Sequence, residues 1–178
     1  RVPKENLIGE ENKGWTYAKY LLEFERGNAY SPGLYRAVNN LREIAKDTPT
    51  GYGRNLIDDN DFINKLNECE IQIQAMEFVE LRIFSALSAG ERVGPESSIL
   101  KCRGTEIQQL LQELSVEAIS HWSLPFIEDT FANVNEPSIG PDYALTITPN
   151  YFNGRKTTIY AGSNEIQRNI ISKAVLGL

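Results

Sequence analysis

Apolar residues recur every three or four positions along most of the chain, which is the periodicity of amphipathic helices. Between Asn12 and Ala45 this pattern predicts one long helix. Pro32 and Gly33 interrupt it, so we expect a kink or a short break there. The apolar positions of this segment are Trp15, Ala18, Leu22, Ala29, Leu34, Val38, Leu41 and Ala45.

The second predicted helix spans about residues 59–89, with Asp58 or Asp59 as N-cap and Gly90 as C-cap. Its apolar seam includes one charged residue, Glu80. This residue is either a buried, paired carboxylate, or it lies beside the seam while Val79 takes the apolar position. We favour the second interpretation. The seam reads Phe62, Leu66, Cys69, Ile73, Met76, Glu80, Ile83 and Leu87.

A third helix is predicted from Pro95 to about Trp122, with Ile107, Leu111, Leu114 and Ala118 as its apolar stripe. Gly104 lies inside it at a cost of about 1 kcal/mol relative to Ala. The glycine indicates that another group approaches the backbone there, although the sequence does not identify that group.

The remaining segments are shorter. Residues 48–55 are expected to form a loop and 124–139 an irregular segment, with helices over 141–153 and 163–175, the last capped by Ser163. Strand signals are almost absent. The predicted fold class is therefore all-α, a four-helix-bundle-like domain with three long helices and shorter C-terminal ones over residues 12–178.

Composition narrows the possible partners. The chain has 178 residues, 41% hydrophobic and 24% charged, with a formal net charge of -6. This balance argues against a nucleic acid or an anionic membrane surface as partner, and no apolar run reaches the roughly 20 residues of a membrane span. Residues 1–11 resemble a linker from a missing middle domain, so we expect a fragment of a cytoplasmic protein.

Cysteine and histidine usage excludes two further kinds of site. Cys69 and Cys102 are isolated from each other, which is unlike a secreted disulfide framework. His121 is the single histidine, so the sequence predicts no zinc site.

Glu25 is the first candidate for chemistry, because it falls on the same helical line as Ala18, Leu22 and Ala29. A carboxylate on an apolar line must be paired, neutralised or directed into a ligand cavity. Burial would raise its pKa toward the range of a general base. A structural carboxylate paired with a basic residue on another helix is the alternative. Arg26 is its direct neighbour and does not share its helix face.

Three stretches resemble the C-terminal helical domain of the acyl-CoA dehydrogenase family, and together they cover nearly the whole chain. They are VPKENLIGEENKGW at the start, LLEFERG in the first helix and IYAGSNEIQRNIISKAVLGL at the end. The resemblance implies the last domain of a three-domain flavoenzyme that contains FAD and acts on an acyl-CoA thioester. A carboxylate would remove the α-proton while the β-hydrogen leaves as hydride to the flavin. Electrons would then pass to an electron-transfer flavoprotein, and such enzymes are homo- or hetero-oligomers.

The resemblance also implies roles for individual residues. Many members carry the base where this chain has Ala161, whereas a subset, similar to isovaleryl- and long-chain-type enzymes, carries it at the position of Glu25. Glu25 is therefore the predicted catalytic base. The matching substrate contacts are Glu23, Phe24, Arg26 and Gly162, and the matching FAD contacts are Ser163, Asn164 and Glu165.

Two departures from the family pattern leave alternatives open. Pro49 stands where the family has an arginine that reaches the flavin of a neighbouring subunit, with Arg54 nearby, and HWSLPFIEDTF replaces a glycine-rich turn. The chain is thus either an active dehydrogenase with Glu25 as base or a catalytically silent subunit of a heteromeric assembly. A flavin monooxygenase of the same fold is a third alternative, which the closing segment disfavours.

Overall fold

The computed structural model describes residues 2–24, 29–126 and 138–178 and confirms an all-α domain. Its helices are α1 (Gly14–Phe24), α2 (Ser31–Asp47), α3 (Asn60–Ser88), α4 (Ser97–Ile119), α5 (Ile147–Gly154) and α6 (Asn164–Ile171). A π-helical turn, Ser172–Leu176, follows α6 directly. Short 3-10 turns cover Lys4–Asn6, Leu56–Asp58, Ser120–Ser123, Asp142–Ala144 and Arg155–Thr158.

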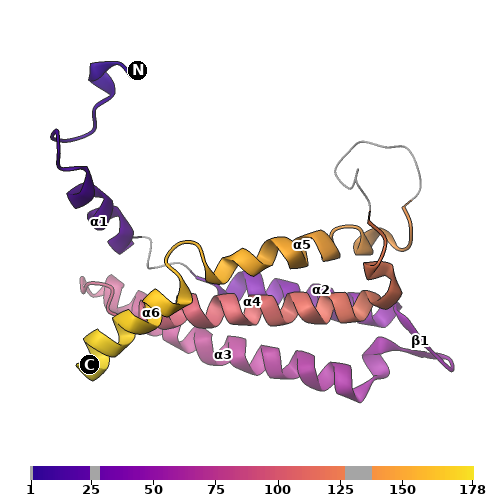
Figure 1. The fold of residues 1–178 in the computed structure, drawn as a ribbon. Helices are drawn as coiled ribbons and strands as arrows, with labels where there is room; N and C mark the ends of the chain where they lie inside the picture. The colour runs from indigo at the N-terminus through magenta and orange to yellow at the C-terminus, as the bar shows by residue number, and fades with distance from the viewer. Residues whose placement is uncertain (1, 25–28, 127–137) are drawn as a thin grey trace.

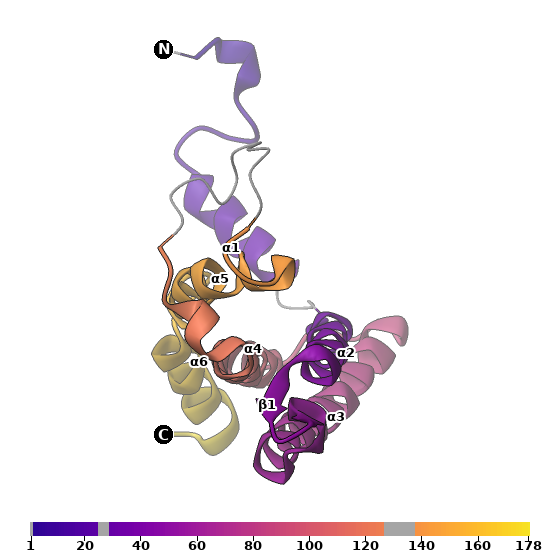
Figure 2. The same ribbon diagram turned by 90° about the vertical axis from the view of Figure 1, so that its right-hand side faces the viewer.

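The bundle is organised around α4. Helices α2 and α3 pack against each other and against one side of α4, and α5 and α6 pack along its other side (Figures 1 and 2). Helix α1 projects away from the bundle with the N-terminus beyond it (Figure 1). Because these four helices all pack against α4, residues on its two sides bring distant parts of the chain together.

The long first helix that the sequence predicts is in fact two helices. α2 begins at Ser31, so Pro32 lies in its first turn, where a residue without an N–H costs nothing. The break falls before Pro32 rather than at it, and residues 25–28 lie outside the described part. The expected apolar line along α1 is also not buried, since Trp15 is 70% and Leu22 46% exposed.

The core confirms most of the predicted apolar positions. The stripes of α2 and α4 are buried as expected, and so is the α3 seam except for Leu87. The shared cluster comprises Leu34, Val38, Leu41, Ala45, Phe62, Leu66, Cys69, Ile73, Met76, Ile83, Leu100, Ile107, Leu111, Leu114 and Ala118. Burial of these side chains stabilises the bundle by roughly 25 cal/mol for each Å² of apolar surface.

Residues 48–55 contain a small hairpin rather than a plain loop. Strand β1 (Pro49–Gly51) pairs with antiparallel β2 (Arg54–Asn55). Gly51, Tyr52 and Gly53 all have positive φ angles, of 93°, 55° and 72°. The two glycines adopt this conformation without a Cβ clash, and they let the chain reverse while the Tyr52 ring stays fully exposed.

Capping explains both ends of α3. Asp59 accepts a hydrogen bond from the Phe62 N–H at 3.0 Å and so begins α3, as predicted. Gly90, in the left-handed region at φ 84°, follows its end. Helix α4 ends at Ile119, three residues before the predicted end, where the chain continues as a 3-10 turn. Among the described helices, none is long and apolar enough to cross a membrane.

Candidate functional site

A two-part groove runs along α4 between α2 and the C-terminal segment. One part, of about 420 Å³, lies against α2, and the other, of about 370 Å³, lies against α5. Gln108, Gln112 and Ser115 of α4 line both parts. We call the combined hollow the α4 groove. Each part falls within the range of small-molecule pockets.

The two parts of the α4 groove differ in polarity. The α2 side is formed by small and apolar residues, Ala29, Gly33, Leu34 and Ala37, together with Tyr30. The α5 side carries amide, hydroxyl and ammonium groups, from Asn150, Asn153, Lys156, Thr157 and Tyr160. A ligand that fills both parts must therefore be apolar at one end and carry hydrogen-bonding groups at the other.

The groove also unites two sequence stretches that are far apart in the chain. Ala29 and Tyr30 come shortly after LLEFERG, and Tyr160 directly precedes Ala161. Burial raises the pKa of Tyr30, and the nearby Tyr160 and Glu80 side chains raise it further. Residues adjoining two of the stretches that the sequence singled out thus line one groove.

The predicted base and its neighbours lie at the edge of the described structure. Glu25 and Arg26 are outside the described residues. Glu23 and Phe24 form the last turn of α1, and their side chains are also outside. Leu22 and Ala29, which flank position 25 on the predicted apolar line, are exposed.

Ala161 and Gly162 form an exposed turn before α6. Both adopt positive φ angles, 53° for Ala161 and 82° for Gly162. A Cβ placed on Gly162 would lie 2.5 Å from the Gln167 Nε2, at the movable end of that side chain. The main structural reason for a glycine here is therefore the left-handed backbone conformation. Its predicted substrate contact stays a prediction.

Ser163 is the N-cap of α6, and Glu165 lies in the first turn of that helix. The Ser163 Oγ accepts from the Ile166 N–H at 3.5 Å, which confirms the predicted cap. Glu165 is in the first turn, where its own backbone N–H and the Ser163 hydroxyl donate to its carboxylate. These hydrogen bonds hold the pKa of Glu165 below its usual value. The pair offers oxygen acceptors at an exposed helix end.

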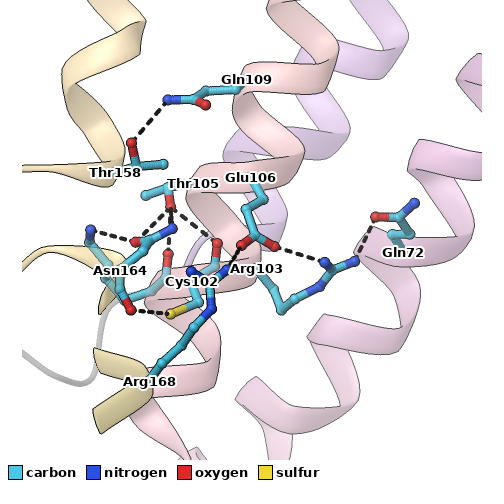
Figure 3. Close-up of polar contacts among 10 residues, drawn as sticks. Gln72, Cys102, Arg103, Thr105, Glu106, Gln109, Thr158, Asn164 and Arg168 are labelled. Atoms are coloured by element: carbon cyan, nitrogen blue, oxygen red, sulfur yellow. Dashed lines mark hydrogen bonds and ion pairs between the residues drawn. The ribbon is translucent and has the colours of Figure 1, made fainter. Parts of the chain in front are cut away.

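Asn164, the third predicted FAD contact, faces α4 instead of solvent (Figure 3). Its Oδ1 accepts from the Lys101 Nζ at 2.8 Å, and its amide donates to the Thr105 hydroxyl at 3.2 Å. The Cys102 thiol donates to its backbone carbonyl at 3.6 Å. Burial lowers the pKa of Lys101. Asn164 thus anchors α6 on α4, a role that its sequence position did not reveal.

A second set of polar contacts extends this anchor across the bundle. Glu106 of α4 pairs with Arg168 of α6 and, at 2.8 Å, with Arg103, whose other nitrogen donates to Gln72 of α3 at 2.7 Å (Figure 3). The Gln109 amide reaches Thr158 at 3.5 Å on the segment that leads to Tyr160. These contacts fix the exposed turn at Ala161 from both sides.

The favoured interpretation of Glu80 is wrong. Glu80 is 2% exposed and occupies the seam of α3, whereas Val79 is only partly buried beside it. Its carboxylate accepts from the backbone N–H groups of Tyr30 and Ser31 and from the Ser31 hydroxyl. The charged residue on an apolar seam was the sequence signal for a buried, paired carboxylate. Its partners could not be identified from the sequence because they lie about fifty positions away.

Comparison with known proteins identifies the fold family. Residues 12–176 match the family described as "Acyl-CoA dehydrogenase, C-terminal domain". The chain belongs to the acyl-CoA dehydrogenase family. The resemblance seen in the sequence is therefore confirmed, and with it the all-α domain class.

Individual relatives extend this comparison. Acyl-CoA dehydrogenase FadE26 of Mycobacterium tuberculosis is 28% identical over 182 residues, covering 100% of this chain and 43% of that protein. The ChsE4–ChsE5 complex of the same species is similar in structure, with a TM-score of 0.74 and 26% identity over 100% of this chain and 43% of the other. PigA, solved with FAD and proline, shares the fold with a TM-score of 0.74 and 17% identity over 99% of this chain and 42% of the other. The chain spans less than half the length of these relatives.

Among the described residues there is no cluster of three or more His, Cys, Asp or Glu side chains that could hold a metal ion. Cys69 and Cys102 are both buried and unpaired, as predicted.

Proposed function

We propose that the chain is the C-terminal domain of an FAD-dependent acyl-CoA dehydrogenase that introduces an α,β double bond into an acyl-CoA thioester. Membership of the family supports the reaction class. The observation that carries the proposal is the α4 groove, because Ala29 and Tyr30, which follow LLEFERG, and Tyr160, which precedes Ala161, all line it. The apolar α2 side would receive the acyl group.

Within this proposal Glu25 is the general base. Its carboxylate would take the α-proton of the thioester, while FAD, when bound, accepts the β-hydrogen as hydride. Glu23, Phe24, Arg26 and Gly162 are the proposed substrate contacts beside it. Ala161 has no ionisable group, so an active enzyme would need its base at another position.

The exposed end of α6 fits one part of FAD. The Glu165 carboxylate and the Ser163 hydroxyl are suited to accept hydrogen bonds from sugar hydroxyls or an amine, whereas a carboxylate disfavours a diphosphate. We therefore assign Ser163 and Glu165 to the adenosine portion. The Asn164 side chain is already hydrogen-bonded to Lys101 and Thr105. Asn164 would therefore contribute to FAD binding through its backbone or by fixing the position of α6.

We further propose that the domain works in an oligomer and transfers electrons to an electron-transfer flavoprotein. The ChsE4–ChsE5 neighbour is a complex of two different chains, and Pro49 replaces the arginine expected at the flavin of a neighbouring subunit. Ala161 favours the second candidate function, a silent subunit that supports an active paralogue.

One experiment separates these two functions. A panel of acyl-CoA thioesters is added anaerobically to the FAD-loaded protein, and flavin bleaching is followed in the wild type and in Glu25→Gln. An active enzyme with Glu25 as base should be reduced, and the variant should be slower by about 10² to 10⁴. Acyl-CoA binding, read from the flavin spectrum, should survive.

Two results would overturn the assignment. A Glu25→Gln protein that bleaches at the wild-type rate would remove Glu25 as base. A wild-type protein that binds acyl-CoA and never bleaches would favour the silent subunit. Ala161→Glu in the Glu25→Gln background is the matched control, and partial recovery of bleaching would place both positions at the same substrate atom.

A further inference from the structure

The N-terminus of α2 is capped by a residue of another helix. Tyr30, at the N-cap position, has helical φ and ψ angles of -96° and -34° and makes no capping bond through its own side chain. Glu80 of α3 supplies the acceptor instead: its Oε1 lies 2.6 Å from the Tyr30 nitrogen and 3.0 Å from the Ser31 nitrogen. Its Oε2 accepts from the Ser31 hydroxyl at 2.5 Å. A carboxylate is well placed here because first-turn N–H groups lack helical partners and carry partial positive charge.

Tyr30 is held a second time through its ring. A Cβ placed on Gly104 would lie 2.5 Å from the Tyr30 Cγ and 2.6 Å from its Cδ1, so the ring rests directly on the α4 backbone. The close approach that the sequence indicated at Gly104 is therefore the Tyr30 ring. Backbone and ring of Tyr30 are fixed independently, the first by α3 and the second by α4.

The residue fixed in this way is part of the α4 groove. Tyr30 is the aromatic member of the α2 side, next to Gly33 and Leu34. Glu80 itself does not line the groove, since it lies behind α2 and is 2% exposed. Any influence of Glu80 on a ligand in the groove must therefore pass through Tyr30 and the first turn of α2.

We propose that Glu80 is a positioning residue that sets the shape of the acyl site by holding Tyr30 in the wall of the α4 groove. The inference rests on the proposed function, because it takes the acyl group as the ligand of the α2 side. With Glu80 in place, Tyr30 limits the width of the groove and so selects among acyl groups by bulk. Without it, the Tyr30 and Ser31 donors lose their acceptor and the first turn of α2 can shift.

The test compares Glu80→Ala, Glu80→Gln and Glu77→Ala in the FAD-loaded enzyme. Glu77 is the matched control, because it also joins α3 to α2, through a 3.0 Å hydrogen bond from the Tyr35 hydroxyl, but leaves the N-terminus of α2 untouched. Two quantities are measured: hydrogen exchange of the peptide containing residues 29–34, and the ratio of kcat/KM for a branched or cyclic acyl-CoA to that for a straight-chain one.

We expect Glu80→Ala to accelerate exchange in residues 29–34 and to change the selectivity ratio by roughly tenfold, since small displacements of a binding wall have effects of this order or larger. Glu80→Gln keeps an acceptor oxygen and should retain most of the wild-type selectivity. Glu77→Ala should leave both quantities unchanged. In a Tyr30→Ala background, Glu80→Ala should alter the ratio no further.

Accelerated exchange with an unchanged ratio would overturn the proposal and leave Glu80 a purely structural residue. A change of ratio that persists in the Tyr30→Ala background would overturn it as well, because the effect would not pass through Tyr30. If Glu80→Ala does not fold, Ser31→Ala removes one of the three bonds, and a ratio equal to wild type would then count against the proposal. A wild-type flavin that no acyl-CoA reduces would overturn the proposed function, and this assignment with it.

Discussion

Lys101 and Asn164 form a buried hydrogen bond, 2.8 Å from Nζ to Oδ1, that joins α4 to the first residue of α6. The two side chains are 9% and 3% exposed. Burial lowers the pKa of Lys101, since the ammonium loses water that its single carbonyl contact replaces only in part. Loss of this hydrogen bond would therefore leave a buried ammonium group without an acceptor.

Asn164→Ala should destabilise the domain by about 2–3 kcal/mol, because it leaves a buried ammonium without its carbonyl acceptor. The same substitution should cost less in a Lys101→Met background, where no charge is left behind. Denaturant unfolding of the four proteins gives the coupling free energy of this cycle. Equal costs in both backgrounds would show that Lys101 does not depend on Asn164.

Gly104→Ala should lower the free energy of unfolding by about 1–3 kcal/mol, since the new methyl would overlap the Tyr30 ring and force it to move. Gly33→Ala in α2 is the control, because nothing lies within 4 Å of the added carbon. That change should be neutral or stabilising by up to about 1 kcal/mol. Thermal unfolding measures both, and a stabilised Gly104→Ala protein would contradict the close contact.

Ser163→Ala should raise the pKa of Glu165 toward its usual value, because the serine hydroxyl is one of the donors that lower it. The sign for stability follows: a carboxyl whose pKa is depressed by folding contributes stability above its unfolded pKa and loses it as the pH falls through the folded one. The contribution should therefore be present at neutral pH and disappear in the acidic range. NMR titration of the Glu165 side chain in both proteins checks the shift, and an unchanged pKa would exclude the serine as its cause.

Cys69 and Cys102 should react slowly with a thiol reagent in the folded protein and rapidly after denaturation. Both are buried, and burial raises the pKa of each thiol, which reduces the thiolate fraction that reacts. Raising the pH should accelerate the folded-state reaction, but only at a higher pH than for an exposed thiol, because the thiol pKa is raised. Rapid labelling of either cysteine at neutral pH would indicate that its helix opens readily.

The seams of α2, α3 and α4 were predictable because burial follows a period that the sequence displays directly. Leu66, Ile73 and Ile107 are fully buried where the spacing put them. The start of α2 was not predictable in the same way, since Pro32 is compatible with either a kink or a first turn. The cap on the preceding residues decides between the two, and it comes from α3.

Side chains whose partners lie far away in the sequence were the main source of error. Glu80 was predicted to lie beside the seam with Val79 in the apolar position, because nothing near it in the chain shows the donors of Tyr30 and Ser31. The side-chain partners of Asn164, Lys101 and Thr105, were likewise not visible in the sequence, and its predicted cofactor contact stays a prediction. The groove was likewise invisible, although two of its boundary stretches could be named from the resemblance.

The borrowed cap on α2 has a consequence for the order of folding. The donors of Tyr30 and Ser31 meet their acceptor only after a loop of nearly fifty residues has closed, and closing that loop costs entropy before the contact repays it. We therefore expect the first turn of α2 to be the last part of that helix to become stable and to form together with the docking of α3. Local opening of the bundle should reverse these steps. When α3 loosens, the first turn of α2, at the end beside the groove, should be the first part of that helix to fray.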